Sequence, residues 1–403
     1  MAKFEYSLSD VSALFKIKYE KLSENIYNSA NVLLGRCKKS YNFVGEKMLI
    51  AVPQSFAGGV GSGKLPTANN AKYGKAEISS KKVYARVEID RETIKAAMKD
   101  EGSFVRATKE VVKKGVESYM RNLSRILFSD GSGKLGTISG ALAGDVCTIS
   151  AASFKEADFE EGDMVDIYNG ATKRNSDPLP ITAVDPQSDG TGKITITGAA
   201  AASAASGDDI YLQNSKGNDP EGLKGVVKDK DSSADSYGIS TDRRWSSVVE
   251  DAGAAAISTD LLNKVMLQVE KKCGKAPNLI VCSYKQYEKI LNLLEDQKRY
   301  TVSTRAGLKT KSGADVSFSG VEFMSSSGPV GIFPERFCDD DRVYFLNDNH
   351  IHIYHRPDFG WFDDDGTVFL RHASEDSYEA RYGGYFNIYI NPAFHGLLDN
   401  LST

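Results

Sequence analysis

The stretch DRETIKAAMKDEGSFVRATKEVVKKGVESYMRNLSRILFSDGSG, from Asp90 to Gly133, holds the longest helical pattern in the chain. Its apolar residues recur at steps of three, four and seven, which places them on one stripe of a helix. They are Val105, Val112, Val116, Tyr119, Leu123, Ile126 and Leu127. Ser103 is the expected N-cap, and Gly131 and Gly133 end the pattern. We therefore predict an amphipathic helix of about 25 residues that needs a broad partner along its length.

The charges of this stretch are unbalanced. Residues 91–128 hold nine Lys or Arg against five Asp or Glu, an excess of four positive charges. Two Glu-first pairs at a spacing of four are expected on the wet face, Glu110 with Lys114 and Glu117 with Arg121. The excess is either a solvated outer face or a loose contact with phosphate backbones. The candidate residues for a contact with DNA are Arg106, Lys113, Arg121 and Arg125.

Length and composition narrow the function classes. The chain has 403 residues, enough for two or three domains, and its net charge of −4 leaves only local, weak contact with nucleic acid. The sequence contains no run of 18 apolar residues, the length that a membrane-spanning helix needs, so we expect no membrane span. The first residues lack the pattern of a signal peptide. The five cysteines are scattered, which favours free, buried thiols over a metal site.

Two segments precede the long helix. Residues 1–45 are expected to form an arm that packs either on its own domain or on a neighbouring subunit. Residues 46–90 are expected to form a long two-stranded hairpin, EKMLIAVPQSF with AEISSKKVYARVEID, joined by the glycine-rich AGGVGSGKLPTANNAKYG. A loop of that length is typical of a functional segment, and an extended hairpin needs a partner surface.

The pattern changes twice after the helix, so we predict an α+β fold. Residues 140–218 contain short, regularly spaced strands separated by Gly, Asp and Ala-Ser stretches, which indicates an inserted small β-barrel or sandwich domain. Residues 219–403 have an α/β pattern. Ser258 is expected to cap a helix that Gly274 ends, and the buried strand PNLIVCS leads to a second helix capped by Ser283.

No motif in the chain indicates an enzyme or a cofactor. Residues 58–64 fit the spacing of a phosphate-binding loop, but Leu65 and Pro66 follow where that motif needs Ser or Thr and a helix. His350, His352 and His355 form HIHIYH, but no acidic or cysteine ligand stands at a recognised spacing, so we expect no metal. CDDDR at 338–342 and FDDDG at 362–366 are expected to be solvated turns.

The order of several segments resembles a known family. EGSFVRATKEVV, LSRILFSDGSGKLG, EGLKGVV and PNLIVCSYKQYEKIL are similar to the major capsid proteins of tailed phages, whose fold is shared with encapsulins. The resemblance implies that residues 91–139 contain the spine helix of a peripheral domain and that 219–403 form an axial domain. It also implies that strands near 316–360 return to the peripheral domain. Residues 46–90 would then be the extended loop that reaches over an adjacent subunit.

The same resemblance implies a function. The chain would assemble through pentamers and hexamers into an icosahedral shell around phage double-stranded DNA, in the cytoplasm of the host bacterium. Expected partners are other copies of the chain, a separate scaffolding protein, a portal and decoration proteins. The expected inter-subunit contacts in the extended loop are Gly58, Gly61, Lys64, Lys72 and Tyr73. An encapsulin-like bacterial compartment shell is the alternative, and an enzyme or nucleotide-binding protein is a remote one.

Overall fold

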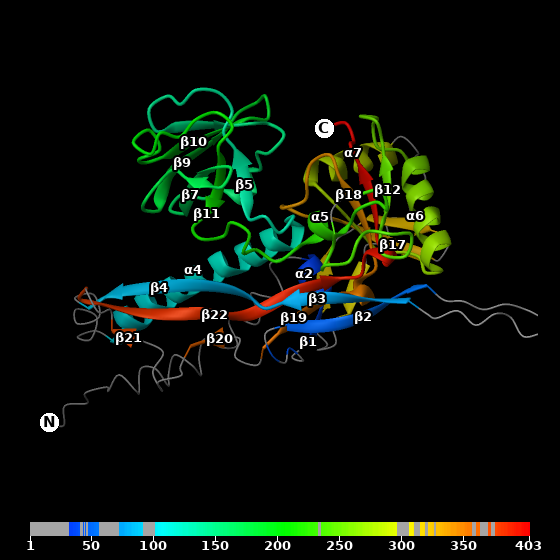
Figure 1. Ribbon diagram of the computed structural model, residues 1–403, viewed down its shortest axis with the longest axis horizontal. Coiled ribbons are helices and arrows are strands. Elements are labelled where there is room, and N and C mark those ends of the chain that lie inside the picture. Colours follow the sequence, from blue (N-terminus) through cyan, green and yellow to red (C-terminus); the bar gives the residue numbers. More distant parts are fainter. Residues whose placement is uncertain are drawn as a thin grey trace, which may run out of the picture.

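Three sheets and two two-stranded ribbons make up the described part of the chain (Figure 1). The computed structural model describes residues 32–40, 43, 45, 47–55, 72–91, 101–232, 235–295, 306–309, 315–318, 321–325, 328–356, 360–362, 370–371 and 375–403. Some of these are described by their backbone alone, namely 89–90, 101–112, 114, 294–295, 306–309, 315–318 and 322. Among the described helices, none combines the length and the apolar character needed to cross a bilayer.

Helix α4 (Glu101–Phe128) confirms the predicted long helix and is 28 residues long. It begins two residues before Ser103, so the prediction of Ser103 as N-cap is wrong. Over the described side chains, the apolar stripe from Val116 to Leu127 is buried, as expected. In Figure 1 α4 lies diagonally across the long strands β4 and β22.

The partner of α4 is a six-stranded sheet, which we call the long sheet. Its strands are β1 (Lys38–Ser40), β4 (Lys81–Asp90), β19 (Ile351–His355), β20 (Gly360–Trp361), β21 (Leu370–Arg371) and β22 (Ser377–Ile390). Gly115 brings the helix close to this sheet, since a Cβ atom there would lie 2.4 Å from Cγ2 of Val87. Tyr119 packs edge-to-face on Tyr382, with ring centroids 5.2 Å apart. The 14-residue β22 therefore supplies the broad surface that the helix needs.

The hairpin prediction is correct for one half of its second strand and wrong for the other half. β2 (Lys47–Ser55) pairs with β3 (Lys72–Ser79) as predicted. The strand is interrupted at Ser80, and the next strand, β4, pairs with β22 instead of β2. The alternation at Val83, Ala85 and Val87 indicates which face is apolar, but it carries no information about which strand lies alongside.

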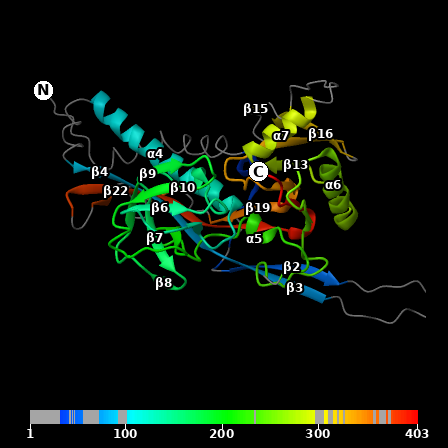
Figure 2. The same ribbon diagram turned by 90° about the horizontal axis from the view of Figure 1, so that it is seen from above.

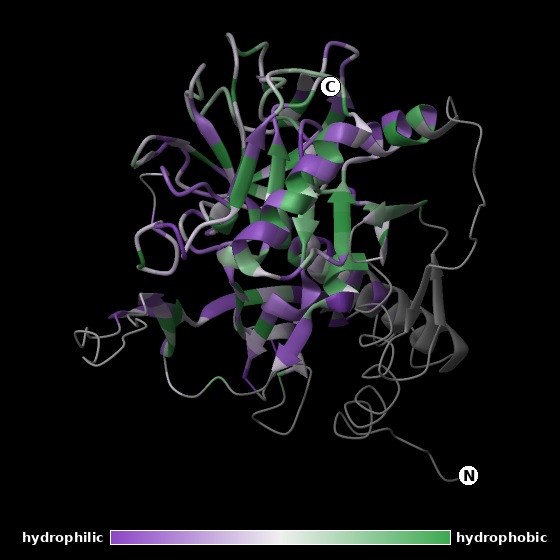
Figure 3. Ribbon diagram, turned by 90° about the vertical axis from the view of Figure 1, so that its right-hand side faces the viewer, coloured by the Kyte–Doolittle hydropathy of each residue, from purple (hydrophilic) through white to green (hydrophobic). Residues whose placement is uncertain are grey.

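The α/β lobe has a six-stranded sheet of its own. Its order is β12 (Val248–Asp251), β23 (Gly396–Asp399), β18 (Val343–Leu346), β13 (Leu279–Cys282), β17 (Gly328–Pro334) and β16 (Val321–Ser325). Helix α6 (Thr259–Cys273) begins as predicted: Leu261 N–H donates to Ser258 Oγ, and Gly274 ends the helix with a φ of 71°. Helix α7 (Tyr284–Glu295) follows β13. Figure 3 shows the hydrophobic strands of the lobe flanked by helices with mixed faces.

The strands between 315 and 346 correct one expectation. In this stretch β15 (Asp315–Phe318) pairs with β14 (Ala306–Lys309), and β16 pairs with β17. The strands near 316–360 were expected to return to the peripheral domain. β16, β17 and β18 instead belong to the lobe's own sheet, and the return to the long sheet begins only at β19.

A seven-stranded antiparallel sheet follows α4, and we call it the small β unit. Its strands are β5 (Lys134–Thr137), β6 (Val146–Ile149), β7 (Met164–Asn169), β8 (Thr172–Lys173), β9 (Leu179–Pro186), β10 (Gly192–Ile196) and β11 (Asp209–Leu212). It has its own apolar core, which includes Val165, Ile167 and Ile194. In Figure 2 it lies beside α4 and apart from the α/β lobe.

Short helices complete the described elements. They are α2 (Val32–Arg36), α5 (Leu223–Val226), η1 (Glu156–Asp158), η2 (Asp348–His350) and η3 (Pro392–Phe394). Glu335 holds α2 in place, since its Oε1 accepts a hydrogen bond from Leu33 N–H at 3.2 Å and the Leu33 side chain is fully buried.

Candidate interaction surfaces

Hairpin β2–β3 has one buried face and one open face. On the inner face Ala76 and Ile78 are fully buried and join a core that also contains Tyr237 and Ile239. On the outer face Leu49 is 59% exposed and Tyr73 is 60% exposed. Alternate residues of a strand point to opposite faces, so the outer face runs along the whole hairpin. It holds exposed apolar side chains together with the exposed Lys47–Glu77 ion pair.

The predicted contact residues of the extended loop fall into two groups. Lys72 and Tyr73 are the first two residues of β3, and both are exposed to solvent. Gly58, Gly61 and Lys64 lie outside the described residues. The structure therefore places two of the five on the outer end of the hairpin.

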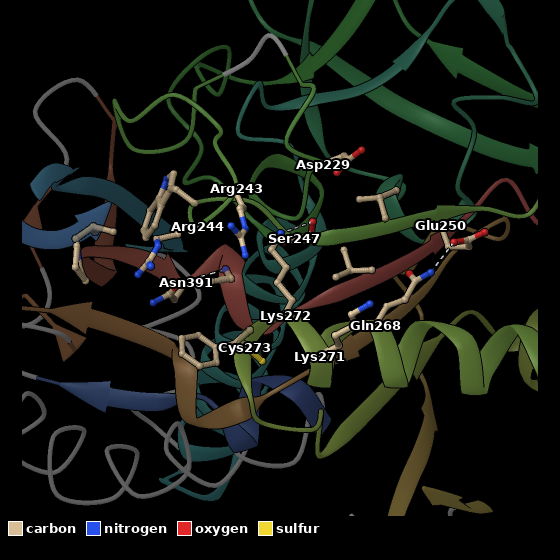
Figure 4. Close-up of a pocket in the computed structure, with 17 residues that line it drawn as sticks. Asp229, Arg243, Arg244, Ser247, Glu250, Gln268, Lys271, Lys272, Cys273 and Asn391 are labelled. Atoms are coloured by element: carbon tan, nitrogen blue, oxygen red, sulfur yellow. Dashed lines mark hydrogen bonds between the residues drawn. The ribbon is translucent and has the colours of Figure 1, made fainter. Parts of the chain in front are cut away.

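A cavity of about 790 Å³ opens at the root of the hairpin, between β2, β12 and the end of α6 (Figure 4). Arg243, Arg244 and Lys271 line it as exposed cations. Lys272 is fixed on its wall: Nζ donates to Ser246 Oγ at 2.7 Å and to the carbonyl oxygens of Ser246 and Ser247 at 2.9 and 3.1 Å. Burial lowers the pKa of Lys272. The sequence signal for this site was the DRRW segment at 242–245, whose two arginines carried no recognised motif.

Two of the four predicted DNA-facing residues of α4 are bound within the chain, which corrects that prediction. Arg121 forms ion pairs with Glu160 and Asp163 of the small β unit. Arg125 is 6% exposed and binds Asp219 Oδ2 through Nη2 at 2.7 Å. Both guanidinium groups therefore hold the small β unit and its return segment against the helix and are not available to a polyanion.

The expected pairs along the helix also change partners. Glu117 was predicted to pair with Arg121, but it lies 3.6 Å from Lys113 Nζ, while Arg121 turns to the small β unit. Two fixed carboxylates at the edge of a folded unit outcompete one solvated neighbour on the helix. Lys113 remains exposed. The side chains of Arg106, Glu110 and Lys114 lie outside the described part.

Asp339 is the centre of a charge network that sequence reasoning missed. Its carboxylate lies 2.6 Å from Lys155 of the small β unit, 3.2 Å from Lys224 of α5 and 3.3 Å from Arg342. Arg342 in turn binds Asp399 at the end of β23. Burial alone would raise the pKa of Asp339, but the three cations lower it to about 2.

This network corrects the prediction of CDDDR as a solvated turn. Asp339 has only 12% of its side chain exposed. Of the three aspartates, Asp340 comes nearest to the expected role, with a half-exposed carboxylate 2.7 Å from the exposed Lys285. No pattern in the neighbouring sequence marks Asp339 as the buried aspartate, because its partners Lys155 and Lys224 are distant in the sequence. FDDDG at 362–366 lies outside the described residues except for its first position.

The histidines and cysteines take structural positions. His350 stacks on Phe394 with ring centroids 3.6 Å apart, and burial lowers its pKa to about 4. His352 stacks near Tyr354, while His355 is buried on the other face of β19. Within the described residues, no group of three or more His, Cys, Asp or Glu could hold a metal ion. Burial raises the pKa of Cys37 and Cys282 to about 12, which disfavours thiolate chemistry there.

Comparisons with known proteins bear on the whole fold. The family described as SU10 major capsid protein matches residues 194–360. The capsid asymmetric unit of cyanophage A-1(L) matches 100% of this chain and 96% of its own, with a TM-score of 0.51 at 9% identity. The procapsid of satellite phage P4 gives 0.44 at 10% identity, over 97% and 96% of the two chains. The SrpI encapsulin complex of Synechococcus elongatus gives 0.42 at 8% identity, over 92% and 86%. A comparison with curated proteins gives no match.

Proposed function

We propose that this chain is a phage major capsid protein, a structural and non-enzymatic subunit of an icosahedral shell, and that hairpin β2–β3 joins its copies. In this proposal the outer face of the hairpin lies on the next copy, head to tail, in pentamers and hexamers that enclose double-stranded DNA. Different surfaces meeting head to tail generate rings and extended lattices, which is the geometry that a shell requires.

The observation that carries the proposal is the open face of the hairpin. A two-stranded ribbon is marginally stable alone, and this one buries only its inner face. Leu49 and Tyr73 are both more than half exposed. Tyrosine is enriched among the residues that dominate interface energies, and burial of Leu49 would add apolar area to the contact. Lys72 and Tyr73 are then contact residues, as are Gly58, Gly61 and Lys64 in the segment that joins the two strands.

We also propose a division of labour along the chain. Residues 1–45 act as an arm and 46–90 as the extended loop. Residues 91–139 contain the spine helix, 140–218 form an inserted domain, and 219–403 form the axial domain with strands returning to the long sheet. The separate cores of the small β unit and the α/β lobe support this division. A separate scaffolding protein, a portal and decoration proteins are the further partners that this role implies.

The test replaces both apolar anchors with carboxylates in the full chain, as Leu49→Asp with Tyr73→Asp. Burial of each anchor contributes about 1.5–3 kcal/mol to a contact, so the double variant weakens each hairpin contact by at least about 100-fold. We expect electron microscopy to show closed particles for the unchanged chain and none for the variant. Circular dichroism should show that the variant remains folded, since both positions are exposed in the monomer.

Met164→Asp is the matched control, because Met164 is a half-exposed apolar residue on the small β unit. We expect that variant to form normal particles. Normal particles from the Leu49→Asp, Tyr73→Asp variant would overturn the role of the hairpin. Analysis of the particle contents then separates a DNA container from a compartment that holds protein.

A further inference from the structure

We propose that the face of the long sheet turned away from α4 contacts the phosphate backbone of packaged nucleic acid. The proposal rests on the proposed function, a shell around DNA, and names the surface that faces the polyanion. We call this surface the basic sheet face. Its cations are Lys38, Lys82, Arg86, Arg356 and Arg381.

The strand register places these residues on one side. β19 pairs with β1 so that His352 lies beside Lys38, and Arg356 continues the same alternation past the end of β19. Arg356 N–H donates to Tyr385 O, and Tyr385 lies opposite Lys82 of β4. Because side chains alternate along a strand, Val83 and Tyr382 point the other way, toward α4. The side turned away from α4 therefore holds the exposed Lys82, Arg86 and Arg381, while Asn387 and Tyr389 toward the end of β22 are buried on it.

The balance of charge on this face is positive. Among the described side chains, two carboxylates, Glu88 and Glu379, oppose the five cations on this face, which leaves an excess of three there. Arg86 and Arg381 both bind Glu379, with Arg86 Nε 2.7 Å from Oε2, so one carboxylate serves two guanidinium groups. Glu88 is bound to Ser377 Oγ at 2.5 Å and lies 3.3 Å from Arg86.

Lys38, Lys82 and Arg356 carry the excess. Within the described residues no carboxylate lies at ion-pair distance from any of the three. Lys38 and Lys82 are exposed. Arg356 is half-buried and donates through Nη2 to Gly45 O at 2.8 Å, so Lys38 and Lys82 are the exposed members of the three. Exposed cations attract a polyanion because binding releases the counterions condensed on its phosphates.

Aromatic rings lie between the cations. Lys82 Nζ is 5.8 Å and Arg356 Cζ is 5.1 Å from the centroid of the Tyr385 ring. Tyr84 is 46% exposed on the same side and packs edge-to-face on Phe362. Cationic and aromatic side chains in alternation are typical of surfaces that bind nucleic acid without reading its sequence.

Two observations favour nucleic acid over a second copy of this chain. Lysine is depleted in protein interfaces, whereas Lys82 lies in the middle of this face, opposite Tyr385. The exposed cations lie on three strands of the sheet, Lys82 and Arg86 on β4, Arg381 on β22 and Lys38 on β1, and this extended arrangement suits a linear polyanion better than a compact patch. The helix face of the same layer is unsuited, because Arg121 and Arg125 are bound to carboxylates there.

The test measures binding of the full chain to a fluorescent 30-base-pair duplex of random sequence over a series of NaCl concentrations. The variant is Lys38→Gln with Lys82→Gln, and the readout is the slope of log K against log salt. Each lost phosphate contact reduces the slope by about 0.9, so we expect a reduction of about 1.8. The matched control, Lys193→Gln with Lys285→Gln, removes the same charge from exposed positions on the small β unit and on α7. It should leave the slope unchanged.

An unchanged slope in the Lys38, Lys82 variant would overturn the inference, as would a reduced slope in the control alone. If the double variant does not fold, Lys82→Gln alone replaces it, with an expected reduction of about 0.9. Electron microscopy of the same samples separates the two proposals. Failure of the unchanged chain to form particles counts against the shell geometry, while the duplex result still decides the sheet face. Loss of particles with an unchanged slope would identify the face as a contact between copies.

Discussion

The small β unit and hairpin β2–β3 join the rest of the chain in opposite ways. The small β unit has a complete core and meets its neighbours through buried or half-buried charges, at Arg121, Arg125 and Lys155. The hairpin has no core of its own, buries one face by apolar contact and leaves the other face open. The first arrangement fixes one orientation within a single chain. The second leaves an interface that another copy can complete.

The difference follows from what each contact costs to break. A buried ion pair is weak evidence of net stability, but removing one partner leaves an uncompensated charge, so the contact has one acceptable geometry. An exposed apolar face contributes nothing until it is covered, and then it contributes in proportion to the area removed from water. Charged contacts are therefore suited to fixing the small β unit within one subunit, and apolar contacts are suited to an interface between subunits.

The largest effect is expected from Arg125→Met. The substitution keeps a similar volume but leaves the Asp219 carboxylate, only 8% exposed, without its partner. We expect the free energy of unfolding to fall by about 3–5 kcal/mol in urea denaturation followed by fluorescence. The companion variant Arg125→Met with Asp219→Leu removes both charges and should recover most of the loss. A loss below about 1 kcal/mol in the single variant would mean that the ion pair does not fix this joint.

The hairpin offers an internal comparison between its two faces. Ile78→Ala on the inner face removes a fully buried side chain and should lower the free energy of unfolding by about 2–5 kcal/mol. Leu49→Ala on the outer face should change it by no more than about 0.5 kcal/mol in the unassembled subunit. Thermal unfolding of the two variants in parallel checks both values. Equal effects would contradict the assignment of an inner and an outer face.

The sequence revealed the elements of this fold better than their partners. The stripe from Val116 to Leu127 and the cap at Ser258 are local signals, and both led to correct helices. The α+β capsid fold followed from a resemblance in the order of segments. β4 was assigned to the wrong partner because alternation shows which face is apolar but not which strand lies alongside.

The charged residues were harder to predict than the apolar ones. Arg121 has a suitable partner at Glu117, and nothing local shows that Glu160 and Asp163 displace it. Asp339 was placed in a solvated turn for the same reason, since Lys155 and Lys224 are distant in sequence. The basic sheet face was missed because it is assembled from four strands, none of which is basic enough to stand out alone.

The smallest effect concerns pH and the joint at Asp339. Its pKa of about 2 lies below the ordinary value of about 3.9, so the folded state favours the ionised form. The resulting stability, about 2 kcal/mol, is fully present above pH 4 and is lost as pH falls from about 4 to about 2. Asp339→Asn should therefore be less stable than the unchanged chain by about that amount at pH 7. The difference should shrink at pH 3, as measured by urea denaturation at both pH values.

The control for this prediction is Asp340→Asn, one residue along the chain. It removes only a half-exposed pair with Lys285 and should lower the free energy of unfolding by less than about 0.5 kcal/mol at either pH. A difference for Asp339→Asn that stays constant down to pH 2 would show that the carboxylate acts through shape and hydrogen bonding. Its charge would then play no part in joining the small β unit to the α/β lobe.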